Sequence, residues 1–124
     1  MKKVEAFIRH EAFEPIRMDL LDKGFPSISI AEYKGSGRQK GITEQYRGSQ
    51  MTIHLRPKLK LEIVVDDTDV RAVIDTILTH ARTGQVGDGK IFVIPVEEAV
   101  RIRTGEDGQE VLQAHETAEI PAGT

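Results

Sequence analysis

The chain has 124 residues, with a formal net charge of −3 and 30% charged residues of both signs. This length fits a single domain that can bury one hydrophobic core, and the charge balance argues against a general nucleic-acid-binding protein, which usually carries a basic excess. The sequence contains no cysteine, which excludes disulfides and thiolate metal sites. Residues 1–6 lack the apolar run of a signal peptide, and no later stretch approaches the roughly 20 apolar residues of a membrane span, so we expect a cytoplasmic protein without direct membrane insertion.

The first half of the chain predicts a strand, a helix and a second strand. Apolar and polar side chains alternate at residues 3–9 and again at 27–34, which is the period of a β-strand. Residues 13–23 between them favour a helix that ends at Gly24, a residue type that readily adopts the backbone conformation of a helix stop. The apolar face of this helix is formed by Ile16, Leu20 and Leu21.

The second half repeats this order with stronger patterns. Residues 56–66 alternate most clearly and predict a third strand. A helix is expected at 67–82, where Asp67 or Thr68 can cap the first turn. A glycine-rich segment then leads into a fourth strand at 90–96. The single apolar stripe of the second helix consists of Val70, Val73, Ile74, Ile77, Leu78 and Ala81.

After the fourth strand, we expect a short helical turn at residues 97–100 and a loose polar tail at 106–124. The order β-α-β-β-α-β consists of two βαβ halves and predicts a ferredoxin-like fold of the α+β class. Two helices can cover only one face of a four-stranded sheet. The other face carries Phe7, Val64 and Phe92 among charged residues and must meet water or a partner, and we favour a subunit interface over ordinary partial exposure.

Three segments that combine glycines with basic residues are candidates for binding an anion. At residues 83–90, glycines free backbone N–H groups to surround an anion and Lys90 adds a charge, although the segment also suits a tight turn. At 101–105, two arginines can bind phosphate bidentately or lie on a solvated strand edge. The segment 34–41 opens a long loop that we expect to be functional, with Lys58 on the returning strand, or it is simply a solvated loop.

Together, these segments resemble the three loops of the PII family of nitrogen regulatory signalling proteins. The similarity covers residues 35–41 and 48–60, then 83–93, and finally 101–106, at the family's spacing and on the matching order of elements. The resemblance implies a ferredoxin-like domain with a four-stranded antiparallel sheet, assembled as a homotrimer with a ligand site in each cleft between neighbouring subunits.

By this resemblance the chain divides into a PII-type domain and a tail. The domain is expected at residues 1–107, and a polar, flexible C-terminal tail at 108–124. The three functional loops of the domain are expected as a T-loop at about 37–55, a B-loop at about 82–90 and a C-loop at about 101–106.

The resemblance implies a site for ATP or ADP. The B-loop residues hold the phosphates, and Arg101 and Arg103 reach the same phosphates from the adjacent subunit. Ser29 stands where the family commonly has a threonine near the adenine, and Val64 lines the base pocket. The expected nucleotide-binding residues are Ser29, Gly35, Gly37, Arg38, Val64, Gly87, Asp88, Gly89, Lys90, Arg101 and Arg103.

The resemblance also implies 2-oxoglutarate as an effector that binds together with Mg²⁺ and ATP. Gln39 is expected to hold the Mg²⁺, with the ATP phosphates supplying most of the oxygen ligands. Lys58 is expected to pair with the distal carboxylate of the effector. The expected 2-oxoglutarate-binding residues are Gln39, Lys40, Gly41 and Lys58.

The tip of the long loop departs from the family pattern. Where the family has a tyrosine that is uridylylated, this chain has Met51, which lacks the hydroxyl needed for a phosphodiester. Ser49 lies where some cyanobacterial relatives are phosphorylated, or it is an unmodified loop serine. Tyr46 and Arg47 are expected to contact a partner. That partner is an ammonium transporter, whose pore the family's arginine plugs, or a nitrogen-assimilation enzyme or regulator.

The resemblance therefore implies a nitrogen regulatory protein without catalytic residues, with at most weak ATPase activity. It would bind ATP, ADP and, with Mg-ATP, 2-oxoglutarate, and would act on partner proteins through the T-loop. One alternative is a slow ATPase, for which Asp88 is the only nearby carboxylate of the motif. Another is a divergent PII-like nucleotide sensor with a different second ligand and target. Nucleic acid is not expected among the partners.

Overall fold

The computed structural model describes residues 1–35 and 56–112, which fold into two α-helices, three short 3₁₀ helices and one four-stranded sheet. The main elements follow in the order β1 (Lys2–Ile8), α1 (Phe13–Asp22), β2 (Ser29–Gly35), β3 (Arg56–Val65), α2 (Val70–Ala81) and β4 (Lys90–Pro95). All three strand pairings are antiparallel, and the strand order in the sheet is β2-β3-β1-β4. The predicted ferredoxin-like α+β fold is confirmed. Among the described residues, neither helix has the length and apolar character required to cross a membrane.

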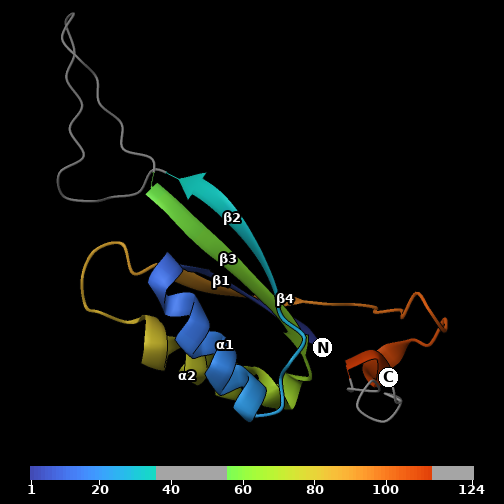
Figure 1. Cartoon of the computed structure of the whole chain (residues 1–124). Coiled ribbons are helices and arrows are strands. Elements are labelled where there is room, and N and C mark those ends of the chain that lie inside the picture. Colours follow the sequence, from blue (N-terminus) through green and yellow to red (C-terminus); the bar gives the residue numbers. More distant parts are fainter. Residues whose placement is uncertain (36–55, 113–124) are drawn as a thin grey trace, which may run out of the picture.

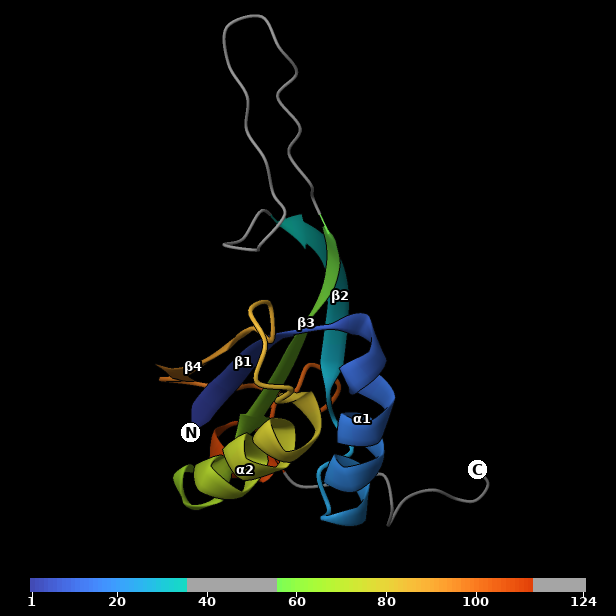
Figure 2. The same cartoon turned by 90° about the vertical axis from the view of Figure 1, so that its left-hand side faces the viewer.

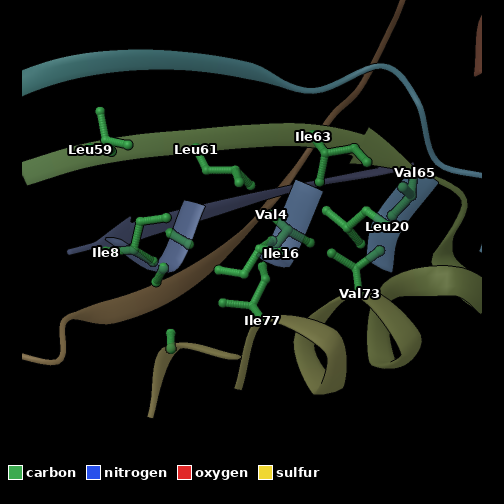
Figure 3. Close-up of a cluster of buried hydrophobic side chains, with 13 residues drawn as sticks. Val4, Ile8, Ile16, Leu20, Leu59, Leu61, Ile63, Val65, Val73 and Ile77 are labelled. Carbon is green, nitrogen blue, oxygen red and sulfur yellow. The ribbon is translucent and has the colours of Figure 1, made fainter. Parts of the chain in front are cut away.

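Both helices pack on the same face of the sheet (Figures 1 and 2). The buried side of the sheet follows the strand period, so that alternate residues of β1 and β3 point into the core. Figure 3 shows these side chains meeting Ile16 and Leu20 of α1 and Val73 and Ile77 of α2. The buried core consists of Val4, Ala6, Ile8, Ala12, Ile16, Leu20, Leu59, Leu61, Ile63, Val65, Val73, Ile77 and Ala81.

The opposite face of the sheet carries charged groups and two aromatic rings, and neither α1 nor α2 covers it (Figure 2). Lys3 and Lys60 both pair with Glu62, at 3.7 and 3.3 Å. Phe7 and Phe92 meet edge to face, with ring centroids 5.9 Å apart. The edge strand β4 also exposes apolar side chains, since Phe92, Val93 and Ile94 are 46%, 40% and 36% exposed.

Two details of the predicted helices are wrong. Leu21 is 49% exposed, because it lies about 100° around the helix from the buried Leu20. Neither Asp67 nor Thr68 caps the second helix, because a short 3₁₀ helix, Asp67–Asp69, precedes α2 and no side chain caps either helix. Asp67 instead forms ion pairs with the terminal ammonium of Met1 at 2.9 Å and with the side-chain ammonium of Lys2 at 3.3 Å.

The segment after β4 also differs from the prediction. Residues 97–100 do not form a helical turn, and Val100 makes an isolated β-bridge with Asp107. A short 3₁₀ helix occurs instead at Gly108–Leu112, within the segment expected to be a loose tail. At the start of this helix, the N–H of Gly108 donates to the carbonyl of Ala99 at 3.1 Å. This backbone hydrogen bond, which forms only in the folded chain, holds the helix in place. The rest of the predicted tail lies outside the described residues.

Candidate functional site

The loop between α2 and β4, residues 82–89, is organised around the carboxylate of Asp88. Its Oδ2 atom accepts the backbone N–H groups of Thr83 and Gly84, both at 2.8 Å, and the Thr83 hydroxyl donates to Oδ1. The hydrogen bonds from Thr83 are the main cause that lowers the pKa of Asp88 to about 2, although burial opposes the shift. The carboxylate is therefore ionised at neutral pH and acts as an internal brace of the loop.

Glycine is required where this loop returns to the sheet. Gly87 and Gly89 have positive φ angles of 104° and 111°. A Cβ atom on Gly89 would lie 1.7 Å from the carbonyl oxygen of Phe7, so only glycine lets the loop approach β1 this closely. None of the described residues accepts a hydrogen bond from the N–H of Gly87, which leaves this donor available to a ligand.

Cationic side chains surround the same loop. Lys58, which lies at the start of β3, donates from Nζ to the carbonyl of Gly87 at 2.9 Å. Arg9, at the end of β1, donates from Nη2 to the carbonyl of Val86 at 3.0 Å and to Oδ1 of Asp88 at 3.3 Å. Lys90 is exposed, and its ammonium has no hydrogen-bond or ion-pair partner among the described residues. The loop therefore combines available backbone donors with positive charge, which suits a phosphate group.

Ser29 and Val64, predicted to lie near a nucleotide base, line one pocket of about 350 Å³. Ser29 is exposed at the start of β2, and Val64 is half-buried on the uncovered face of the sheet. The far wall of the pocket comes from the segment after β4, including Ala99 and Leu112. The structure thus brings these two residues together in a hollow with an apolar wall.

The two predicted phosphate-binding arginines lie on a separate turn. The N–H of Arg101 donates to the carbonyl of Glu106 at 2.7 Å, and its Nε donates to the Glu106 carboxylate at 3.0 Å. Arg103 and Ile102 are exposed at the tip, where Ile102 is 99% exposed. Figure 1 places this turn at the opposite end of the domain from the loop of Gly87, so a single chain does not bring Arg101 and Arg103 to that loop.

Several predicted site residues lie outside the described residues. These are Gly37, Arg38, Gln39, Lys40, Gly41, Tyr46, Arg47, Ser49 and Met51. Gly35 is described and ends β2, paired in register with Arg56. The described part of the chain therefore contains the 82–89 loop. It also contains Lys58, whereas the other expected 2-oxoglutarate-binding residues lie outside it.

Arg9 and Thr83 are residues of this site that were not predicted from the sequence. Both act through contacts with Asp88. The signal available in the sequence was indirect: β1 and β4 are neighbours in a ferredoxin-like sheet, so the residue after β1 lies near the loop before β4.

Comparison with known proteins identifies the family. A family model described as "Nitrogen regulatory protein P-II" matches residues 1–106. The chain belongs to the P-II family. The resemblance inferred from the sequence is thereby confirmed, and the four-stranded sheet with two helices fits this assignment.

Relatives from distant organisms match over nearly the same span. The chain is 51% identical to "Nitrogen regulatory protein P-II" of Nostoc punctiforme over 112 residues, which are 90% of this chain and 100% of the relative. It is 49% identical to the protein of the same name from Synechocystis, with the same coverage. It is also 49% identical to "Nitrogen regulatory protein P-II 2" of Methanothermobacter thermautotrophicus, over 90% of this chain and 97% of the relative. The family's name describes regulators and not enzymes.

Proposed function

We propose that this P-II protein is a nitrogen regulator that binds ATP or ADP at the 82–89 loop and transmits the bound state to partner proteins. The observation that carries the proposal is the loop itself. Asp88 braces the loop from within and Lys58 donates to the Gly87 carbonyl, while no residue in the described ranges accepts from the Gly87 N–H. A phosphate can accept from such a donor, and the exposed Lys90 nearby adds a positive charge.

The chemistry of Asp88 favours a regulator over an ATPase. A general base should have a pKa near the working pH, whereas the pKa of Asp88 is about 2. Its two oxygens are also occupied by Thr83, Gly84 and Arg9. Asp88 is therefore a poor candidate for activating water, and the proposal assigns no catalytic residue.

We further propose that the nucleotide site is completed by a second copy of the chain in a homotrimer. The turn with Arg101 and Arg103 lies far from the 82–89 loop of its own chain (Figure 1). In a trimer, this turn would reach the loop of a neighbour, where the exposed Arg103 could bind phosphate. Ser29 and Val64 would hold the adenine in the pocket that they line.

Mg²⁺ and 2-oxoglutarate are proposed as further ligands. The Mg²⁺ would be held by Gln39 and by oxygen atoms of the ATP phosphates. Lys58 would pair with the distal carboxylate of 2-oxoglutarate, and Lys40 and Gly41 would complete the site. The Lys58 ammonium is bonded to the Gly87 carbonyl, so a carboxylate at Lys58 would compete with a contact of the phosphate loop.

The proposed output runs through residues 37–55 of this cytoplasmic protein. Tyr46 and Arg47 would contact an ammonium transporter or a nitrogen-assimilation enzyme or regulator. Uridylylation at position 51 is excluded because the residue is methionine. The switch would therefore act through ligand contacts at the base of the loop, with Ser49 as the candidate for modification.

Isothermal titration calorimetry with ATP, Mg²⁺ and 2-oxoglutarate tests this proposal. We expect ATP to bind alone, and 2-oxoglutarate to bind only when both Mg²⁺ and ATP are present, because the phosphates must supply most metal ligands. Replacing ATP by ADP should abolish or greatly weaken the binding of 2-oxoglutarate. Tight binding of 2-oxoglutarate to the apo protein would contradict the scheme. ATP binding without any response to 2-oxoglutarate would favour the divergent sensor.

A further inference from the structure

We propose that Arg9 is a positioning residue of the nucleotide site, which fixes the 82–89 loop in the geometry that binds phosphate. This inference rests on the proposed function, because it concerns how the same loop is prepared for its ligand. Arg9 is not part of the glycine-rich motif and lies at the far end of the sequence, between β1 and the 3₁₀ helix His10–Ala12. Its side chain nevertheless reaches across to the loop.

The backbone of Arg9 is itself held in place. Its carbonyl accepts the N–H of Ala12 at 3.1 Å, in the turn that connects β1 to α1. Ala12 and Ile8, on either side of this turn, belong to the buried core. The Arg9 side chain therefore starts from a rigid point of the fold and not from a free loop.

The Arg9 guanidinium makes two contacts that together fix the direction of the loop backbone. Nη2 donates to the carbonyl of Val86 at 3.0 Å and to Oδ1 of Asp88 at 3.3 Å. Because a peptide unit is planar and trans, holding the Val86 carbonyl toward Arg9 turns the N–H of Gly87 the opposite way. This N–H is the donor that none of the described residues uses. Arg9 thus aims a phosphate-binding donor without needing to touch the phosphate.

Such a clamp is needed because the loop is rich in glycine. Gly84, Gly87 and Gly89 all have positive φ, and glycine loses more conformational freedom on ordering than any other residue. A loop ordered before binding avoids this loss when the ligand arrives. Lys58 also holds the loop, at the Gly87 carbonyl, but the same lysine is the proposed partner of the effector carboxylate. Arg9 holds the loop through contacts of its own, with the Val86 carbonyl and with Asp88.

One atom of the Arg9 side chain lowers the stability of the folded protein. Its Nε atom is buried and has no hydrogen-bond partner among the described residues, and a buried unpaired donor opposes folding. The ion pair with Asp88 does not remove this cost, since it uses Nη2. The contacts of Nη2 with the loop therefore coexist with an unpaired donor on the same side chain.

The test compares ATP affinity in the full-length parent, Arg9→Gln, Arg9→Lys and the control Arg17→Gln. Arg17 is an exposed arginine of α1 that bonds to Glu14 and lies outside the site. We expect roughly a tenfold loss for Arg9→Gln, roughly a threefold loss for Arg9→Lys, which keeps the charge but not the planar fork, and no change for the control. A cycle with Asp88→Asn should be non-additive, so that the double variant loses no more than the weaker-binding single variant.

The outcomes separate this inference from the function on which it rests. If the parent binds ATP and Arg9→Gln binds it equally well, or if the losses of Arg9→Gln and Asp88→Asn simply add, Arg9 does not position the loop. If Arg9→Gln is too unstable to titrate, full parental affinity in Arg9→Lys overturns the proposal. A parent that does not bind ATP would overturn the proposed nucleotide site, and the role of Arg9 with it.

Discussion

At the scale of single residues, the cationic side chains that could bind a nucleotide differ in how many hydrogen bonds and ion pairs they already make within the protein. Arg101 is bonded to Glu106 through both its backbone N–H and its Nε. Arg103 and Lys90 are exposed, and no hydrogen bond or ion pair within the described residues involves either side chain. A ligand phosphate can therefore gain full charged contacts from Arg103 and Lys90, while Arg101 would have to share its guanidinium.

Replacing either exposed cation should weaken ATP binding without unfolding the protein. Lys90→Ala and Arg103→Ala should each cost at least roughly 1.5 kcal/mol, or about tenfold in Kd, since each removes a charged hydrogen-bond partner of the phosphates. Calorimetry gives the Kd, and circular dichroism checks the fold. Arg82→Ala is a matched control at an exposed position of the same loop. Unchanged ATP affinity in Lys90→Ala or Arg103→Ala would show that the residue concerned is not a phosphate ligand.

Asp88 predicts a specific dependence of stability on pH. Its folded-state pKa of about 2 lies below the ordinary 3.8, so the unfolded state binds the proton more readily. The stabilisation from its ionised form is present above about pH 4 and is lost as the pH falls toward 2. We expect the melting temperature of the parent to fall more between pH 5 and pH 2.5 than that of Asp88→Asn. Parallel pH profiles of the two proteins would contradict this role of Asp88.

At the scale of elements, regular periodicity was sufficient for prediction where the element is long. The helix expected at 67–82 begins with a 3₁₀ turn and continues as α2 (Val70–Ala81), and the strand expected at 56–66 is β3 (Arg56–Val65). The errors occur where contacts remote in sequence decide. Asp67 is bonded to the ammonium of Met1, and the 3₁₀ helix Gly108–Leu112 depends on the carbonyl of Ala99. Local propensity contains no information about such partners.

In the candidate site too, local sequence features were predictable and contacts between segments remote in sequence were not. The glycines and Lys90 of the 82–89 loop were predictable, because their types and spacing are local features of the sequence. The attachment of this loop by Arg9 was not, since β1 must first pair with β4. The contact of Lys58 with the Gly87 carbonyl likewise exists only once β3 lies beside β1.

The junction between the loop and the sheet should tolerate no side chain at Gly89. An alanine there combines positive φ with a Cβ 1.7 Å from the Phe7 carbonyl, so the backbone of β1 or the loop must move. Gly84→Ala is the matched control, with a φ of 87° but no atom within 4 Å of its Cβ, and should cost only about 1–2 kcal/mol. Urea unfolding should show a clearly larger loss for Gly89→Ala. Equal losses would mean that backbone strain alone, and not close packing against β1, requires glycine at 89.

At the scale of the whole molecule, neither of the described helices α1 and α2 covers the second face of the sheet (Figure 2). Both helices lie on the other face (Figure 2). The uncovered face combines the aromatic pair Phe7 and Phe92 with the charged network of Lys3, Lys60 and Glu62. A monomer would leave the apolar part of this face and of β4 in water, at a cost of roughly 25 cal/mol for each Å² of apolar surface. A subunit interface on this face would remove that cost.

We therefore expect the protein to be a homotrimer in solution. Light scattering should give about three times the 13.8 kDa of one chain. Phe92→Asp should dissociate the assembly, because it places a charge among the exposed apolar residues of β4, where Phe92 is 46% exposed. Met18→Asp is the matched control, since Met18 is 55% exposed but lies on α1, in the helical layer. The dissociated variant should also lose ATP affinity, because the arginine turn no longer reaches a neighbouring loop. A parent that stays monomeric at all concentrations would refute both the interface and the shared site.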